Sequence, residues 1–263
     1  MNKKFLLFVP FYNCENQIAK LVNQLNNEVC ETFDEVIFVN NRSIDNTQKI
    51  LIESLRRKEI NISWKIFLND FNYNLGGSHK VAFNYAIENR YDYIVVLHGD
   101  AQGSISDLIN NLDQLNDNVD CFLGSRFDSH SVRVGYSLFR TLGNYVFNFL
   151  CSLSLNKRIT DMGSGLNCFK INFLAKNDFI KLPDDLVFNN MMLFFMDYKE
   201  ANYKFFPIKW VEEDQVSNAK LFSQSYKILK MCIKYLFGFR RFILSDTSVK
   251  NKKYSYKIVE SSS

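Results

Sequence analysis

The stretch YIVVLHGDAQG, from Tyr93 to Gly103, decides how the rest of the sequence is interpreted. Its first half is a short apolar run rich in β-branched residues, which is typical of a strand buried inside a parallel sheet. Gly99 and Gly103 then interrupt the run, so we expect the strand to end near His98. In open α/β sheets, ligands bind at the carboxyl ends of the strands.

Three polar residues, His98, Asp100 and Gln102, alternate with small residues in the second half of this stretch. If the segment stays extended, alternate side chains point the same way. One imidazole, one carboxylate and one amide oxygen can together hold a divalent cation and leave positions open for phosphate oxygens. The alternative is a strand-end turn whose polar side chains face water.

The composition indicates a globular chain with a large core. With 263 residues, of which 47% are hydrophobic and 23% charged, it suits one α/β domain or two small ones. Only 3 prolines and 10 glycines argue against long disordered linkers, and 6 scattered cysteines without paired spacing indicate reduced thiols. The apolar runs are too short to span a bilayer, and the first one ends at Pro10, so we expect a strand there rather than a signal peptide. These features predict a cytoplasmic protein.

Strand-like and helix-like patterns alternate along the first half of the chain, which predicts a doubly wound, mostly parallel α/β sheet. The expected strands are residues 4–10, 35–39, 63–68, 93–97 and 121–124, and the expected helices are residues 16–29, 45–55, 80–88 and 106–115. The second half is less regular. There we expect helices at 135–155 and 186–199, a turn at 161–165 and a strand at 204–210.

Six segments, in this order, resemble motifs of the family 2 glycosyltransferases: VPFYNCEN (9–16), VNNRSIDNT (39–47), LHGDAQG (97–103), GSR (124–126), DMGSG (161–165) and PIKW (207–210). The resemblance covers residues 5–221 and is greatest to the dolichol-phosphate mannose synthase branch. It implies a GT-A catalytic domain over residues 1–217. The charge pattern sets residues 218–263 apart as a basic amphipathic helix and tail. It also implies an inverting, metal-dependent hexosyltransferase that uses a nucleotide-diphosphate sugar.

The resemblance assigns nucleotide-sugar contacts to two strand ends and to two lysines: Pro10, Tyr12, Glu15, Asn41, Ser43, Asp45, Lys80 and Lys220. An aromatic face and a carboxylate after the first strand can hold a base or ribose edge. Ser43 and Asp45 can equally cap the following helix. Lys80 can reach a diphosphate or lie solvated near a helix start, whereas Lys220 can close over the donor within a loop.

The segment that contains His98, Asp100 and Gln102 lies where the family has its metal-binding D-x-D motif. The resemblance therefore implies that these three residues bind Mg²⁺ or Mn²⁺ as the cofactor. His98 stands where the family has aspartate, and it can be either a ligand or a buried structural histidine. Asn40 and Asn41 replace an acidic pair of the family, so the preference for a nucleobase does not carry over.

The acceptor decides which residues act in the reaction. Arg126 and Arg140 match family arginines that bind a lipid phosphate, and the alternative for them is a salt bridge within the protein. A hydroxyl acceptor needs a general base, for which Asp185 is the candidate, although Asp184 and Asp185 can also cap a helix. Three functions therefore remain: transfer to a polyprenyl phosphate, transfer to a hydroxyl of a lipid-linked glycan in surface polysaccharide synthesis, or a non-catalytic nucleotide-sugar-binding subunit.

The end of the chain is strongly basic, since residues 218–257 carry ten lysines and arginines against one aspartate. On a helix over residues 222–244, four basic residues form one stripe opposite a broad apolar face: Lys227, Lys230, Lys234 and Arg241. This pattern predicts peripheral association with an anionic membrane surface. A helix packed on the protein is the alternative, and nucleic acid is not an expected partner.

Overall fold

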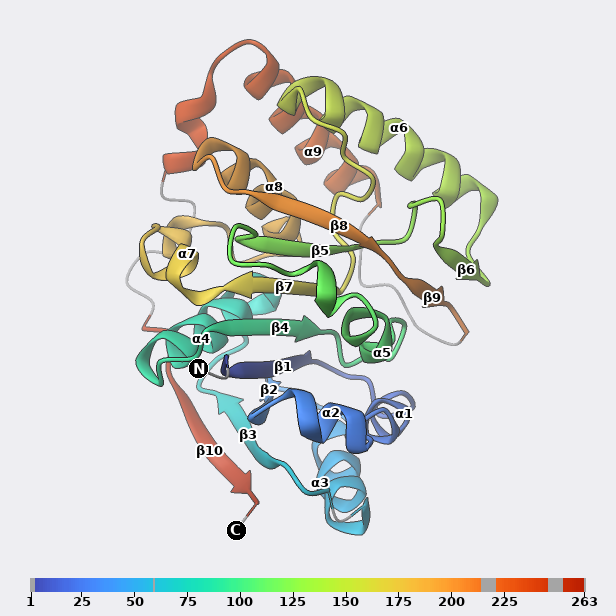
Figure 1. Ribbon diagram of the computed structural model, residues 1–263, viewed down its shortest axis with the longest axis vertical. Coiled ribbons are helices and arrows are strands. Elements are labelled where there is room, and N and C mark those ends of the chain that lie inside the picture. Colours follow the sequence, from blue (N-terminus) through green and yellow to red (C-terminus); the bar gives the residue numbers. More distant parts are fainter. Residues whose placement is uncertain (1–2, 59, 214–220, 246–252, 263) are drawn as a thin grey trace.

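An eight-stranded sheet forms the centre of the computed structural model, which describes residues 3–58, 60–213, 221–245 and 253–262. Its strand order is β10-β3-β2-β1-β4-β7-β5-β8 (Figure 1). The strands are β1 (Phe5–Phe11), β2 (Glu35–Asn40), β3 (Ser63–Asn69), β4 (Tyr93–Leu97), β5 (Cys121–Ser125), β7 (Leu166–Lys170), β8 (Tyr203–Pro207) and β10 (Tyr256–Ser261). The expected mostly parallel sheet is confirmed.

Two strands that the sequence analysis did not predict run against the others. β7 lies between β4 and β5 and is antiparallel to both, and β10 is antiparallel to β3 at one edge. The strand expected at 204–210 is divided in two, because β8 ends at Pro207 and β9 (Lys209–Val211) pairs with β6 (Val132–Val134) in a small second sheet. β7 and β9 belong to the side of the sheet that carries the later motifs, whereas β10 closes the opposite edge.

The central strands are buried on both faces, which explains their continuous apolar sequences. In β1, Leu6 and Phe8 face one core, whereas Leu7 and Val9 face the other. The first core contains residues of α4 (Asn74–Glu88), α6 (Leu138–Leu155), α7 (Ile171–Ala175), α8 (Phe188–Tyr198) and α9 (Leu221–Leu236). The second contains residues of α1 (Ile18–Asn23), α2 (Asn27–Thr32), α3 (Thr47–Lys58) and α5 (Ile105–Ile109). The sheet is therefore doubly wound.

Three helices differ from expectation. The helix expected at 106–115 ends early, as α5 over Ile105–Ile109, and a 3₁₀ turn follows over Leu112–Gln114. The other two differ for local reasons. The helix expected at 16–29 is two short helices, because the Asn26 side chain accepts a hydrogen bond from the Val29 amide at 3.1 Å and starts α2. α4 begins at Asn74, before the glycine pair, rather than after it. A Cβ at Gly76 would lie 2.3 Å from the Pro183 carbonyl oxygen, so a side chain does not fit between α4 and the segment before α8.

The end of the chain is part of the main fold. α9 packs beside α6 at one end of the molecule, and Figure 1 shows the pair beyond β8. β10 lies at the opposite edge of the sheet, so residues beyond 217 form a strand in addition to the expected helix. Among the described residues, no helix combines the length and apolar character needed to cross a membrane.

Candidate active site

A cavity of about 430 Å³ opens at the carboxyl ends of β1, β2 and β4. Its size falls within the range of small-molecule sites, and its position is the one at which open α/β sheets bind ligands. Five residues predicted from the sequence line it: Pro10, Tyr12, Asn41, His98 and Asp100. The structure therefore brings together side chains from three separate strand ends.

A network of asparagine amides forms one wall of this cavity. Asn41 is buried, its Oδ1 accepts a hydrogen bond from the Tyr73 amide at 2.7 Å, and its Nδ2 donates to Asn72 Oδ1 at 2.8 Å. The sequence analysis missed the residues that follow β3 and begin α4, namely Asn72, Asn74, Leu75 and Ser78. The polar run NDFNYN at 69–74 was the available signal. Fixed amides of this kind can bind the polar edge of a base or ribose.

Ser43, Asp45 and Glu15 join the loops after β1 and β2 to each other. Ser43 Oγ accepts a hydrogen bond from the Asn13 amide at 3.1 Å, and Asp45 Oδ2 accepts one from the Glu15 amide at 3.3 Å. Asp45 Oδ1 also accepts one from the Thr47 amide at 3.1 Å, at the start of α3. In this structure the three side chains connect the loops that border the cavity. Asp45 has the helix-capping role that was the alternative to nucleotide binding.

The segment after β4 does not stay extended, so the expected alternation of His98, Asp100 and Gln102 is wrong. Ala101 has a φ of +55°, in the left-handed region, and its amide donates to the His98 carbonyl oxygen at 3.4 Å. His98 and Asp100 line the cavity, whereas Gln102 does not. The Gln102 carbonyl oxygen accepts a hydrogen bond from the Val211 amide of β9 at 2.9 Å, and the Gln102 amide donates one to Asp100 Oδ1 at 3.3 Å. A role for the Gln102 side chain as a metal ligand therefore stays a prediction.

His98 is held as a neutral imidazole beside the cavity. Burial lowers its pKa; the negative charge of Asp100 opposes this effect and the positive charge of Arg126 adds to it. Its Nε2 is buried without a hydrogen-bond partner within the described part of the chain. A neutral imidazole nitrogen and a nearby carboxylate suit a divalent cation. The described residues contain no group of three His, Cys, Asp or Glu side chains arranged around a metal, so phosphate oxygens would have to supply further ligands.

Gly165, in the DMGSG segment, leaves room for the His98 ring. A Cβ at Gly165 would lie 2.7 Å from His98 Cγ, so we expect Gly165→Ala to displace the ring and weaken nucleotide binding. The overlap is expected to destabilise the fold by about 1–3 kcal/mol. Isothermal titration and urea unfolding measure the two effects.

Gly143→Ala is the matched control, because no atom lies within 4 Å of a Cβ built at that helical position. It is expected to stabilise α6 by about 0.5–1 kcal/mol and leave nucleotide binding unchanged. Equal nucleotide affinity in both variants would show that the position of the His98 ring does not matter for binding.

Arg126 is nearly buried and forms a two-pronged ion pair with Asp161. Its Nε donates to Asp161 Oδ2 at 2.7 Å and its Nη2 donates to Asp161 Oδ1 at 2.8 Å. Burial alone would lower the pKa of Arg126, but the charge of Asp161 raises it overall, so the guanidinium stays charged. The salt bridge within the protein, which was the alternative role for Arg126, is therefore present. The positive charge of Arg126 also contributes to the lowered pKa of His98.

Arg126 and Arg140 lie near the same aromatic ring, and their predicted role at an acceptor phosphate stays a prediction. The guanidinium carbons of Arg126 and Arg140 lie 5.9 and 4.7 Å from the centroid of Tyr136. Arg140 pairs with Glu212 at 2.6 Å and keeps a third of its side chain exposed. Arg133, which the sequence analysis missed, lies 4.8 Å over the ring of Phe127, where Arg126 also lies. We call Arg126, Arg133 and Arg140 the arginine group.

The predicted positions of Lys80, at a diphosphate or solvated near a helix start, are both wrong, because the structure places it in a buried ion pair. Its side chain has no exposed surface, and its Nζ lies 2.7 Å from Asp184 Oδ1. The Tyr254 hydroxyl accepts a hydrogen bond from the same Nζ at 3.0 Å. In this position Lys80 links α4 to the segment before α8 and to the end of the chain.

Asp185 takes the capping role that was the alternative to a general base. Its Oδ1 accepts a hydrogen bond from the Val187 amide at 3.0 Å, one residue before α8 begins. Its Oδ2 lies 2.6 Å from Lys227 Nζ of α9. Lys220 lies outside the described residues, so its role over the donor remains a prediction.

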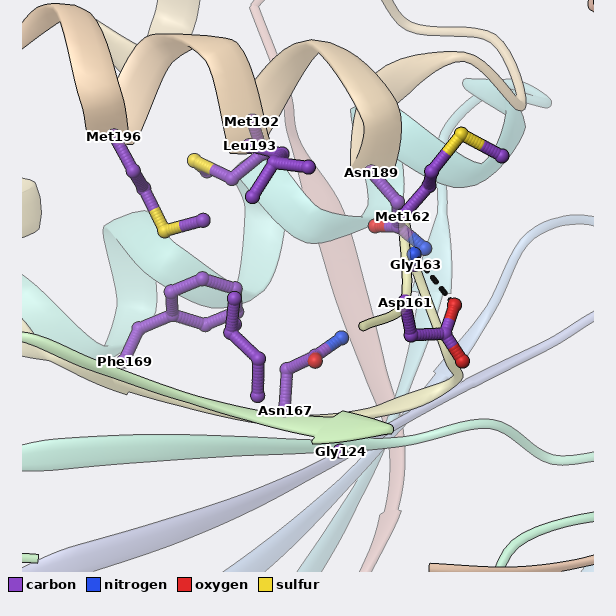
Figure 2. A pocket seen from close by; sticks show the side chains of 11 residues that line it. Gly124, Asp161, Met162, Gly163, Asn167, Phe169, Asn189, Met192, Leu193 and Met196 are labelled. Carbon is purple, nitrogen blue, oxygen red and sulfur yellow. Dashed lines mark hydrogen bonds between the residues drawn. The ribbon is translucent and has the colours of Figure 1, made fainter. Parts of the chain in front are cut away.

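A second, much smaller cavity lies behind Asp161. It has a volume of about 20 Å³, room for about one water molecule, and its lining of eleven residues includes Met192 and Met196 of α8 and Phe169 of β7. Figure 2 shows Asp161 at its edge, with the Gly163 amide directed at the carboxylate, a hydrogen bond of 3.0 Å. This space is too small for a sugar, so the larger cavity is the candidate donor site.

The fold, the strand-end cavity and the motifs around it define a nucleotide-sugar-using glycosyltransferase of the GT-A type. The profile of "Glycosyl transferase family 2" matches residues 7–177, and the chain belongs to that family. A UDP-N-acetylglucosamine–dolichyl-phosphate N-acetylglucosaminyltransferase of Methanococcus voltae is 28% identical over 178 residues, covering 64% of this chain and 70% of the relative.

Solved structures agree with this assignment of the fold. Glucosyl-3-phosphoglycerate synthase of Mycobacterium tuberculosis in complex with UDP has a TM-score of 0.63 at 11% identity, over 90% of this chain and 81% of the synthase. The solved chain of S. aureus TarS, residues 1–349, has a TM-score of 0.52 at 21% identity, over 91% of this chain and 73% of the TarS chain. The same synthase is also known with Mn²⁺, UDP-glucose and phosphoglyceric acid.

Proposed function

We propose that this chain transfers a sugar from a nucleoside diphosphate sugar to a membrane-embedded polyprenyl phosphate. The observation that carries the proposal is the arginine group, which the segment 161–165 connects to the strand-end cavity. Arg126 Nη2 donates a hydrogen bond to the Gly163 carbonyl oxygen at 3.2 Å, and the amide of the cavity residue His98 donates one to the Gly165 carbonyl oxygen at 3.1 Å. Guanidinium groups bind phosphate in a planar, two-pronged geometry. The dolichyl-phosphate acceptor in the name of the M. voltae relative supports the same acceptor class.

In the proposed reaction, an oxygen of the acceptor phosphate attacks the anomeric carbon of the sugar. The bond from that carbon to the donor diphosphate breaks, and the nucleoside diphosphate leaves with the electron pair. The acceptor phosphate is already anionic at neutral pH, so no side chain has to remove a proton. This agrees with a structure in which Asp185 is engaged by Lys227 and by the start of α8.

The cavity residues would hold the donor. Tyr12 and the Asn41 amide wall suit the base and ribose, and Pro10 and Gly99 bring backbone close to them. Asp100, with His98 beside it, would hold Mg²⁺ or Mn²⁺, which when bound neutralises charge on the leaving diphosphate. The Mn²⁺ in the synthase structures supports a divalent cation of this kind.

Arg140→Ala tests the acceptor. We expect it to raise the acceptor KM by roughly ten- to a hundredfold, because one charge-assisted contact is worth about 1.5–3 kcal/mol, and to leave donor binding unchanged. Asp185→Asn should change kcat little, since it weakens only structural contacts, the bond to the Val187 amide and the ion pair with Lys227. The measurement is transfer of a labelled sugar to a short-chain polyprenyl phosphate, with the corresponding polyprenol as the acceptor without charge.

Glu212→Gln is the matched control, because it releases the Arg140 guanidinium without removing it. It should leave the acceptor KM equal or lower. The reverse pattern, a normal KM in Arg140→Ala and a kcat lowered about 10²–10⁴-fold in Asp185→Asn, would assign a hydroxyl acceptor instead. Donor binding without transfer to any acceptor would favour a non-catalytic subunit.

A further inference from the structure

One face of α6 exposes seven large apolar side chains. They recur at helical spacing along the whole helix, and each is between 48 and 87% exposed: Leu138, Phe139, Leu142, Tyr145, Val146, Phe149 and Leu153. The opposite face is buried against the protein through Cys151 and Leu155. Soluble proteins rarely leave a continuous apolar patch of this kind in water. This face of α6 therefore requires a partner.

α9 and the turn after it extend the apolar surface. Six further apolar side chains are exposed there, by 38 to 70%: Tyr226, Leu229, Ile233, Leu236, Phe237 and Phe239. The other face of α9 packs into the core, and Ser154 Oγ of α6 donates a hydrogen bond to the Cys232 carbonyl oxygen at 3.1 Å. The helices are thus fixed side by side (Figure 1). We call the thirteen exposed side chains of the two helices the α6–α9 surface.

The two helices and the turns that follow them carry only positive charges of their own. Three of these charges are paired with carboxylates of neighbouring segments: Arg140 with Glu212, Lys157 with Asp197 and Lys227 with Asp185. Residues 138–158 and 221–245 contain no aspartate or glutamate, and their charged residues are Arg140, Lys157, Arg158, Lys227, Lys230, Lys234, Arg240 and Arg241. At the end of α9, an open groove of about 650 Å³ combines both features, because Phe237, Phe239 and Phe242 line it together with Lys234 and Arg241. An apolar floor with a basic rim complements acyl chains below anionic headgroups.

We infer that the α6–α9 surface docks on an anionic lipid bilayer. A second copy of the chain is a poorer occupant, because two such surfaces would bring like charges together. Arg140 lies in the first turn of α6, next to the exposed Phe139, so docking would bring the arginine group to headgroup level. The sequence predicted only the basic tail helix for this role, and the structure adds α6 as the larger apolar element. The inference explains how the proposed lipid acceptor is reached, but vesicle binding can be measured without catalysis.

The experiment compares two double variants in co-sedimentation with vesicles of phosphatidylglycerol and phosphatidylcholine. Phe139→Ser with Phe149→Ser removes two rings of the α6–α9 surface, which are 79 and 67% exposed. We expect the vesicle affinity to fall roughly tenfold or more, since each ring contributes apolar area to the interface. The control is Phe71→Ser with Ile258→Ser. These two side chains are 68 and 54% exposed but lie outside the α6–α9 surface, so the control should bind vesicles as the wild type does.

Two further measurements complete the test. Lys230→Gln with Arg241→Gln should weaken binding and reduce its dependence on salt, because exposed charges are screened over about 10 Å at 0.1 M. Asp100→Asn should bind vesicles normally, which separates docking from the proposed reaction. Wild-type protein that does not sediment with either these vesicles or pure phosphatidylcholine would overturn the inference. So would an equal loss in both serine variants, or a dimer in sedimentation velocity that only the α6 serines dissociate.

Discussion

Asp100→Asn is expected to reduce glycosyl transfer by at least about 10²–10³-fold, because it removes the one carboxylate that the turn after β4 presents to the cavity. Asparagine keeps the shape of the side chain and loses its charge. The residue lies outside the buried core, so the free energy of unfolding should change by less than about 1 kcal/mol. The measurements are labelled-sugar transfer, and calorimetric binding of a nucleoside diphosphate with and without Mn²⁺.

The matched control is Asp113→Asn, at an exposed position of the 3₁₀ turn Leu112–Gln114, where the same loss of charge should leave transfer unchanged. In Asp100→Asn, nucleotide binding should lose its dependence on Mn²⁺ along with the turnover. Wild-type turnover that persists in excess chelator would remove the metal from the proposal. With that result, Asp100 would have only a structural role in the turn after β4.

The parallel strands could be predicted because their information is local. β1, β2 and β4 are buried on both faces, so each is a continuous apolar run in the sequence. β7 and β10 could not be predicted in the same way. Each is specified by pairing with a strand distant in sequence, β4 for β7 and β3 for β10, and their own sequences alternate only weakly.

The same distinction between local and long-range information applies to the residues of the candidate site. Pro10, Asn41 and Asp100 could be placed together because the carboxyl ends of neighbouring parallel strands meet at one edge. Gln102 does not line the cavity, and a single left-handed residue, Ala101, turns the chain between it and Asp100. The partners of the two arginines also depend on tertiary contacts, which the motifs alone do not contain.

Lys80 is the residue for which local reasoning failed most completely, since its partner Asp184 is 104 residues away. Two buried groups of opposite charge are stable together, but removing one leaves the other charged in an apolar surrounding. We therefore expect Lys80→Met, which keeps the length of the side chain, to lower the free energy of unfolding by about 3–5 kcal/mol. Urea unfolding followed by circular dichroism measures the change.

Lys176→Met is the control, because that lysine is exposed and its substitution should cost less than about 0.5 kcal/mol. Adding Asp184→Asn to Lys80→Met should recover part of the loss, since both charges are then gone and the Tyr254 hydroxyl can still bond to the amide. Because Leu186 lines the donor cavity only two residues beyond Asp184, the single variant should also weaken nucleotide binding, and the double variant should restore it. A Lys80→Met protein as stable as the control would mean that the buried pair does not hold the cavity wall in place.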